Sequence, residues 1–263
     1  MIKAVNGQIV AILFWSLTTV AWGAAEPSKP IAMVSDVWCP FTCSPRSSRP
    51  GYITEVAKQI LEPQGYRTSY RALPWVRAIR EVKDGQADIL LGSSRDEFPG
   101  GVYPPEPVGL VYDSFVVKAD DPWRYSGVES LLSRRLGVPK GYDIGLLNRY
   151  LAAHPENGLV YIIDGENVSK RGLMMLNAGR IDTYLDVAEV VTYTARKMRH
   201  SEGFRFAGKV QNQMNIYLVV SPTRNDSAQL AELLARGIRN LRETGGLKEI
   251  LSRYGMADWK PPQ

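Results

Sequence analysis

Residues 72–92 read Ala-Leu-Pro-Trp-Val-Arg-Ala-Ile-Arg-Glu-Val-Lys-Asp-Gly-Gln-Ala-Asp-Ile-Leu-Leu-Gly and predict a complete strand–helix–strand unit. Pro74 suits the first position of the helix, because its fixed φ is already close to the helical value. One face of this helix carries, at helical spacing, Trp75, Ile79 and Val82. Gly85 ends the helix, since glycine adopts the left-handed conformation without strain. The apolar run from Ala87 to Leu91 is typical of a strand buried on both faces.

This unit also predicts where a ligand binds. Parallel sheets of this kind bind small molecules beyond the carboxyl ends of their strands, which here means near Trp75, Arg77 and residues 93–95. The same rule applies to the first expected strand, residues 31–37, because polar residues and an indole follow it directly. The candidate site therefore gathers residues from two loops at one edge of the sheet.

The rest of the chain predicts an α/β protein with two lobes, each a mixed sheet flanked by helices. Two short segments occupy the same position, at the end of a helix, in two successive strand–helix series: Gly85-Gln86-Ala87-Asp88 and Gly179-Arg180-Ile181-Asp182. This correspondence favours two similarly built lobes. The final strand and helices return to the first lobe, so two adjacent chain crossings form a hinge. Expected strands are 31–37, 67–72, 87–91, 110–117, 136–138, 159–163, 181–185 and 215–220, and expected helices cover 51–61, 74–82, 144–151, 168–177, 230–241 and 247–254. The expected division is a signal peptide over 1–25, lobe one over 26–119 and 218–263, and lobe two over 120–217.

The first 25 residues differ from the rest of the chain. Lys3 is their only charge, residues 9–20 are apolar, and small residues near 23–25 offer cleavage sites, as in a secretory signal peptide. We therefore expect an exported, periplasmic protein. In that oxidising compartment the two cysteines, Cys39 and Cys43, are expected to form a disulfide, since a metal site would need further ligands.

Charge and motifs narrow the function classes. Removal of Lys3 with the signal peptide changes the net charge from +5 to +4, and the basic residues are spread along the chain, so no nucleic-acid partner is expected. Motifs for a nucleophile elbow, a phosphate loop or a dinucleotide are missing from the sequence. His154 and His200 have no neighbouring nucleophile motif. We therefore expect no cofactor, no metal and no catalytic residue.

Six short motifs, taken in order, resemble one protein family. They are Ser35-Asp36-x-Trp38-x-Pro40-Phe41, Gly51-Tyr52-x-x-Glu55, Pro74-Trp75-x-Arg77-Ala78, Gly85-x-x-Asp88, Gly137-Val138-x-x-Gly141 and Gly179-Arg180-Ile181-Asp182. From about Ile31 to Tyr254 the chain resembles the family 3 extracellular solute-binding proteins, the periplasmic components of polar amino-acid ABC transporters. The resemblance implies the two-lobed periplasmic binding protein fold (type II), a small polar solute bound between the lobes, and a membrane ABC permease as partner. We expect a monomer.

The resemblance also implies roles for individual residues. An acidic residue and an aromatic residue after the first strand contact the ligand in this family, which points to Asp36 and Trp38 here. The turn before the first helix of lobe two, Lys140-Gly141-Tyr142, offers backbone donors to an anionic group, as free amides at a helix start do in general.

Two positions depart from the family pattern. Amino-acid binders clamp the ligand carboxylate with an arginine later in the loop that follows the Gly-x-x-Asp strand, whereas the arginine here, Arg95, comes earlier. They place an amine-binding carboxylate where this chain has Val187, and Asp186 stands one residue short, on the opposite face of a strand. These departures leave open whether the ligand is an α-amino acid.

The expected function is capture of a small polar or amino-acid-like solute for an ABC transporter. The expected ligand-binding residues are Asp36, Trp38, Tyr52, Trp75, Arg77, Ser93, Arg95, Tyr142 and Asp186. Most have a structural alternative: the aromatic residues as packing, Asp36 as a cap of its own turn, Arg77 as a partner of Glu81, and Arg95 as a partner of its acidic neighbours. Two other functions stay open, namely an exported dehydratase-like enzyme that uses Asp36 and Glu55 as an acid pair, and a ligand sensor that serves a receptor.

Overall fold

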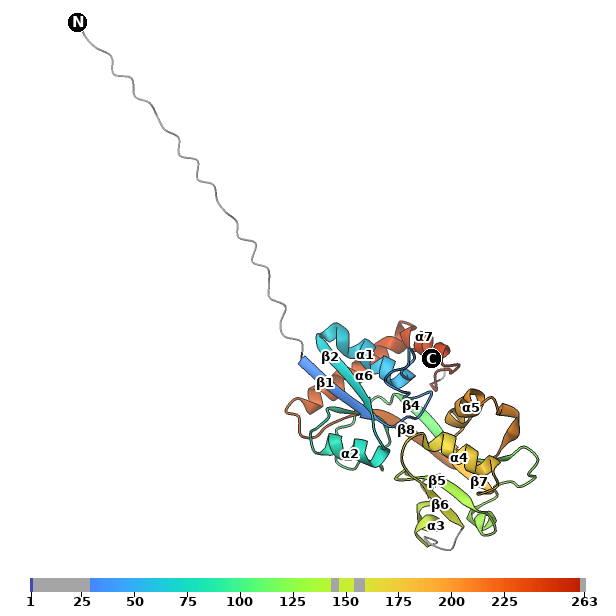
Figure 1. Cartoon of the computed structure of the whole chain (residues 1–263). Coiled ribbons are helices and arrows are strands. Elements are labelled where there is room, and N and C mark those ends of the chain that lie inside the picture. Colours follow the sequence, from blue (N-terminus) through green and yellow to red (C-terminus); the bar gives the residue numbers. More distant parts are fainter. Residues whose placement is uncertain (2–28, 143–146, 154–158, 261–263) are drawn as a thin grey trace.

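The computed structural model describes residues 29–142, 147–153 and 159–260 together with Met1. The predicted signal peptide, apart from Met1, lies outside the described residues. Within them, eight strands pair in the order β2-β1-β3-β8-β4-β7-β5-β6. Figure 1 shows the result as two lobes, with β4 and β8 running from one into the other. None of the described helices is long and apolar enough to cross a membrane.

Lobe one is built on three parallel strands, with β1 (Lys29–Ser35) between β2 (Tyr66–Ala72) and β3 (Ile89–Ser93). β3 pairs on its other side, antiparallel, with the end of β8 (Phe204–Val220). All five residues of β3 are buried, because helices cover both faces of the sheet. These helices are α1 (Tyr52–Leu61), α2 (Trp75–Lys83), α6 (Ser227–Glu243) and α7 (Gly246–Arg253).

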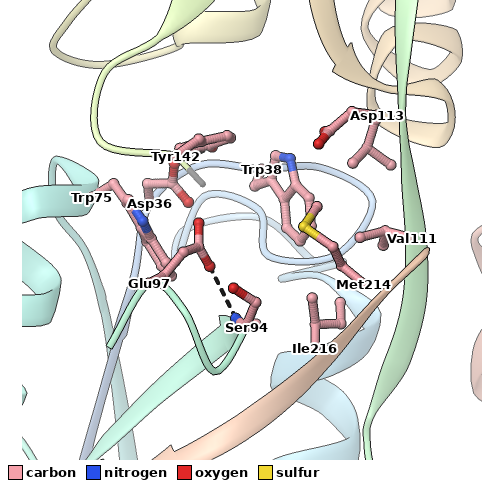
Figure 2. A pocket seen from close by; sticks show the side chains of 12 residues that line it. Asp36, Trp38, Trp75, Ser94, Glu97, Val111, Asp113, Tyr142, Met214 and Ile216 are labelled. Atoms are coloured by element: carbon pink, nitrogen blue, oxygen red, sulfur yellow. Dashed lines mark hydrogen bonds between the residues drawn. The ribbon is translucent and has the colours of Figure 1, made fainter. Parts of the chain in front are cut away.

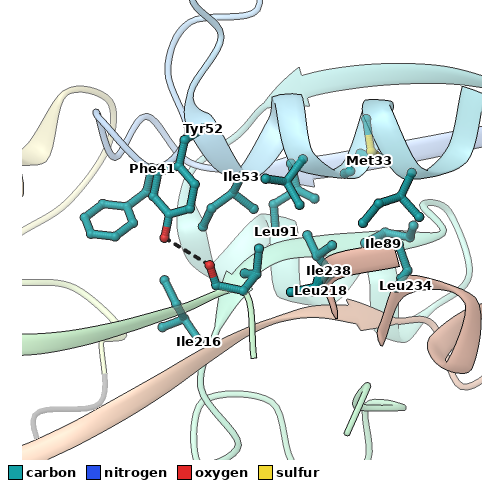
Figure 3. Close-up of a cluster of buried hydrophobic side chains, with 14 of the residues drawn as sticks. Met33, Phe41, Tyr52, Ile53, Ile89, Leu91, Ile216, Leu218, Leu234 and Ile238 are labelled. Carbon is teal, nitrogen blue, oxygen red and sulfur yellow. Dashed lines mark hydrogen bonds between the residues drawn. The ribbon is translucent and has the colours of Figure 1, made fainter. Parts of the chain in front are cut away.

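The core of lobe one lies between its sheet and the layer formed by α1, α6 and α7. Figure 3 shows α1 and α6 against the strands, with Ile53, Leu234 and Ile238 meeting Met33 and the apolar side chains of β3. These residues recur every three or four positions along each helix, so each helix turns one apolar stripe towards the sheet. On the other face, α2 buries Ala78 and Val82.

Lobe two repeats this plan on a smaller scale. β5 (Leu136–Pro139) pairs in parallel with β6 (Val160–Ile163) and with β7 (Thr183–Val187), and β7 pairs antiparallel with β4 (Gly109–Lys118). The sheet is therefore mixed, as expected. The helices of this lobe are α3 (Leu147–Ala153), α4 (Val168–Asn177) and α5 (Ala188–Lys197).

The lobes are joined by β4 and β8. These strands pair antiparallel from Gly109 opposite Ile216 to Lys118 opposite Phe204, with a register shift between Tyr112 and Ser114. Side chains before the shift on β4 pack in the core of lobe one, and those after it pack in the cores of lobe two. We therefore propose that the lobes meet near Tyr112. The boundaries at 119/120 and 217/218 stay predictions.

Most predicted elements are present, and two segments were missed. Helix α4 has the predicted bounds. Pro74 is the N-cap of α2 instead of its first helical residue, so this helix begins one residue later than predicted. Helix α5 was missed because β-branched residues, which favour strands, fill much of it. The first half of β8 was missed because a bulge interrupts its alternation: Phe115 lies opposite Gly208 and Val116 opposite Phe206, which leaves Ala207 as the extra residue.

The stability of lobe one depends on the stripe of α6 that faces the sheet. Leu234 is fully buried there, whereas its neighbour Leu233 is only partly buried. We expect Leu234→Ala to lower the free energy of unfolding by about 2–5 kcal/mol, because it removes buried methyl groups and leaves a cavity. Leu233→Ala is the matched control and should cost less than half as much. Urea unfolding followed by circular dichroism measures both, and equal losses would contradict the packing described.

Candidate ligand-binding site

A cavity lies between the lobes, beyond the carboxyl ends of β1 and β3, where the switch-point rule placed it. Its volume is about 30 Å³, room for about two water molecules. Figure 2 shows side chains reaching it from both lobes and from the two joining strands. The lining consists of Asp36, Trp38, Trp75, Gly92, Ser94 and Glu97 from lobe one, Tyr142 and Val187 from lobe two, and Val111, Asp113, Met214 and Ile216 from β4 and β8.

The loop after β1 positions Trp38 firmly. Two backbone hydrogen bonds join Trp38 to Thr42. The amide of Trp38 donates to the carbonyl of Thr42 at 2.7 Å, and the amide of Thr42 donates to the carbonyl of Trp38 at 3.2 Å. The disulfide between Cys39 and Cys43 closes the same short loop, which confirms the predicted pairing. The ring of Phe41 stacks on the indole, with 4.2 Å between ring centroids. Because backbone, disulfide and ring stacking all constrain this loop, the indole is held in place before any ligand arrives.

Gly51 anchors this loop to the start of α1. Its φ is 104°, and a Cβ atom there would lie 2.3 Å from the carbonyl oxygen of Phe41. A side chain would therefore clash with the loop as well as strain the backbone. The next two amides, of Tyr52 and Ile53, donate to the carbonyls of Pro40 and Phe41 at 3.0 Å each.

Two hydrogen bonds cross from one lobe to the other at the cavity. Tyr142 Oη donates to Asp36 Oδ2 at 2.6 Å, and Trp38 Nε1 donates to Asp186 Oδ1 at 3.4 Å. Asp186 also accepts bonds from Ser169 Oγ at 2.6 Å, Tyr184 Oη at 2.8 Å and its neighbouring amide at 2.8 Å. The structure is therefore the closed form, with the lobes held together by side chains of the site itself.

The site is acidic. Burial, followed by the charge of Asp186, raises the pKa of Asp36 to about 6 despite the hydrogen bond from Tyr142. Burial also raises the pKa of Asp186, although four hydrogen bonds to it act in the opposite direction. Glu97 and Asp113 add two further carboxyl groups to the lining. Lys and Arg are absent from its twelve described residues.

The structure brings five of the nine predicted residues to the cavity. Four line it, namely Asp36, Trp38, Trp75 and Tyr142. The indole of Trp75 lies edge-on to Tyr142, with 6.1 Å between ring centroids. Asp186 is fully buried behind Trp38, which it binds. That these five residues bind a ligand stays a prediction.

The other four predicted residues lie elsewhere in the closed form. Tyr52 is buried in the core of lobe one and donates to the carbonyl of Val108 (Figure 3), and Ser93 is buried with its hydroxyl on the carbonyl of Ser94. Arg77 pairs with Glu81 at 3.1 Å, the structural alternative considered for it. The guanidinium of Arg95 lies 4.8 Å and 4.9 Å from the ring centroids of Tyr103 and Tyr217. Its role as a carboxylate clamp stays a prediction.

Sequence reasoning missed the acidic residues Glu97 and Asp113. Asp113 had a signal, since it is the one charge inside the apolar run from Leu110 to Val117. Glu97 was considered only as a partner of Arg95. In the structure its Oε2 accepts the backbone N–H of Ser94 at 2.9 Å, as Figure 2 shows. Both residues therefore belong to the candidate site.

Comparison with solved structures defines the class of fold. A histidine kinase sensor domain with similarity to periplasmic binding proteins is 21% identical, with a TM-score of 0.72 over 87% of this chain and 96% of that one. The arginine-bound amino acid ABC transporter substrate-binding protein AbpA of Streptococcus pneumoniae is 17% identical, with a TM-score of 0.69 over 86% and 94%. A structure of the glutathione import system GshT–TcyBC of Streptococcus mutans is 14% identical, with a TM-score of 0.75 over 89% and 98%.

The chain therefore has the two-lobed type II fold of periplasmic binding proteins, as the family resemblance implied. No protein-family model matches the chain, and no curated protein matches its sequence at a significant level. At these identities the likeness establishes the fold.

The buried Asp36 carboxyl predicts an unusual dependence of stability on pH. Its pKa is about 6 in the folded protein and 3.8 as an ordinary aspartate. The folded protein thus holds this proton more tightly than the unfolded chain, so the stabilisation is complete below about pH 4 and is lost as the pH rises through about 6. We expect Asp36→Asn, which cannot ionise, to gain up to about 3 kcal/mol relative to wild type between pH 4 and pH 7.

Urea unfolding at pH 4 and pH 7 measures this gain. Asp164→Asn is the control, because Lys140 lowers the pKa of Asp164 and this exposed carboxyl is therefore ionised in the folded protein throughout the tested range. The control should not show the gain between pH 4 and pH 7 that is expected of Asp36→Asn. A pH-independent difference between Asp36→Asn and wild type would show that this carboxyl is not buried as described.

Proposed function

We propose that this protein is an exported solute-binding protein that closes its two lobes on a small polar solute and presents the closed form to a membrane ABC permease. One observation carries the proposal: a single cavity is lined at once by lobe one, by lobe two and by both joining strands. A solute held there contacts both lobes only when they are closed. It therefore shifts the population towards the closed form by its extra contacts.

The closed form also shows which contacts must break before a solute can enter the cavity. The cavity of about 30 Å³ has room for about two water molecules, so we expect the lobes, or Trp38 and Tyr142, to separate before a larger solute binds. Opening breaks the bonds from Tyr142 to Asp36 and from Trp38 to Asp186. Each of these is of the order of 1 kcal/mol in a folded protein. Solvation of the two released carboxyl groups offsets part of that loss.

The comparisons favour transport over the two alternatives. Two of the three structures described above come from ABC import systems. The sensor domain among them shows that this fold also serves signalling. The periplasmic location and the monomeric state are part of the proposal, supported by the predicted signal peptide and by the binding-protein fold.

A screen for stabilising ligands tests the proposal. Thermal unfolding in the presence of amino acids, amines, organic acids and sugars should reveal a class that raises the melting temperature, because a ligand that binds only the folded state stabilises it. Small-angle scattering should then show one compact form with that ligand and a more open average without it. If no compound changed either measurement, the solute-binding function would be wrong.

Once a ligand is found, Trp38 should matter more than another indole outside the cavity. We expect Trp38→Phe to weaken binding at least about tenfold, because it removes the ring edge that faces the cavity and the N–H that bonds to Asp186 across the lobes. Trp123→Phe is the matched control, since its indole N–H also makes one bond, to Ser130, within lobe two. Isothermal titration calorimetry measures both, and an equal effect of the two variants would contradict the site.

A further inference from the structure

A second cavity lies between the lobes, and its described lining shares no residue with that of the candidate site. Its volume is about 560 Å³, a size typical of pockets for small ligands. Residues 47–49 and 253–255 form its wall in lobe one, and Tyr193, Arg196 and Lys197 of α5 form its wall in lobe two. In Figure 1, α5 lies on the same side of the molecule as α7. We call this cavity the interlobe groove.

The charged side chains in the described lining of the groove are all basic. They are Arg49, Arg196, Lys197 and Arg253. The last three stand in the final turns of α5 and α7, where the helix dipole favours cations. The helix ends therefore explain why cations gather here, and the partners of each cation decide whether it is available to a ligand.

On the wall in lobe one, Arg253 is neutralised and Arg49 is not. The guanidinium of Arg253 bonds to Glu55 and to Glu249. Arg49 Nη1 donates to the backbone carbonyl of Arg253 at 2.9 Å, and Arg49 makes no ion pair within the described chain. This bond holds the guanidinium of Arg49 at the groove and leaves its other N–H groups for a ligand.

On the wall in lobe two, neither cation has a carboxylate partner among the described residues. The ammonium of Lys197 lies 5.7 Å from the centroid of the Tyr193 ring, and the side chain of Arg196 makes no ion pair and no hydrogen bond there. One carboxylate, that of Glu189, lines a smaller cavity that shares Tyr193 and Arg196 with the groove. Three unpaired cations thus stand at the groove, against one carboxylate beside it.

The groove suits an anion, because a cleft lined by charges of one sign concentrates the electric field and attracts ions of the opposite sign. Guanidinium groups bind phosphate and carboxylate groups through two parallel hydrogen bonds. Arg49 and Arg196 belong to opposite lobes, so an ion with two separate anionic groups can contact both walls at once. The groove therefore favours a polyanion over an ion with a single anionic group.

We propose that the interlobe groove is a second binding site, for a small soluble anion with two or more phosphate or carboxylate groups that bridges the lobes. This site is separate from the candidate solute site and does not depend on what that site binds. Because the bridging anion contacts both walls in this arrangement of the lobes, it favours the closed form. By linkage, it also raises the affinity for any solute that favours the same form.

Isothermal titration calorimetry on the mature protein, with pyrophosphate, citrate and inorganic phosphate, tests the site. The ionic strength is kept constant, because salt screens exposed charges. We expect at least one of the two polyanions to bind with one-to-one stoichiometry, at least tenfold more tightly than inorganic phosphate. If neither bound, or if neither bound more tightly than phosphate, the site would be wrong. Binding to phosphatidylglycerol vesicles without binding of either soluble polyanion would also overturn it, in favour of a membrane surface.

Variants on the two walls test the bridge. Arg49→Gln and Arg196→Gln should each weaken binding of the polyanion about tenfold, because each removes the guanidinium of one wall. Arg236→Gln removes the same charge from an exposed position on α6, outside the described lining of the groove, and should leave the affinity unchanged. Loss of affinity in only one groove variant would show that the anion does not bridge the lobes. An equal loss in the control would show that net charge alone attracts the anion, and either result overturns the inference.

Discussion

The pairing of β4 with β8 is the constraint on which the rest of the structure depends. These strands stay hydrogen-bonded from Gly109 to Lys118 while they pass from one lobe to the other. The first of their two register shifts lies between Tyr112 and Ser114, at the level of the cavity, where Val111 and Asp113 face the same space. Residues two apart on a strand share a face, so one side of β4 forms a wall of the cavity. The residues of β4 that line the cavity therefore also lie where the strand passes from one lobe to the other.

Two opposing contributions determine the free energy of lobe closure. The bonds from Tyr142 to Asp36 and from Trp38 to Asp186 favour closure, and so does the packing of Val187 and Val190 from lobe two in the core of lobe one. Burial of the two carboxyl groups opposes it, because both prefer to ionise in water. At neutral pH the second contribution grows, because the pKa of Asp36 in the closed form is about 6 and its carboxyl group then loses its proton.

The sequence was a good guide to the sheet and a partial guide to the site. Helix-stop glycines, apolar runs and the switch-point rule placed both lobes and brought Asp36, Trp38 and Trp75 to the right edge. These patterns could not place the side chains of Arg77 and Arg95, which are fixed by contacts with other side chains. Arg77 pairs with Glu81, and Arg95 lies against Tyr217, which is far away in sequence. Tyr52 fell on the apolar stripe of α1 and went to the core. Such outcomes depend on packing between distant elements, which residue spacing does not record.

The loop after β3 places two neighbouring side chains of opposite charge in different surroundings. Arg95 and Glu97 stand two residues apart in this loop, and the structure turns only Glu97 towards the cavity. The rings of Tyr103 and Tyr217 hold the guanidinium outside, and the amide of Ser94 holds the carboxylate at the lining. One short loop thus separates two opposite charges, with the carboxylate at the cavity lining and the guanidinium outside it.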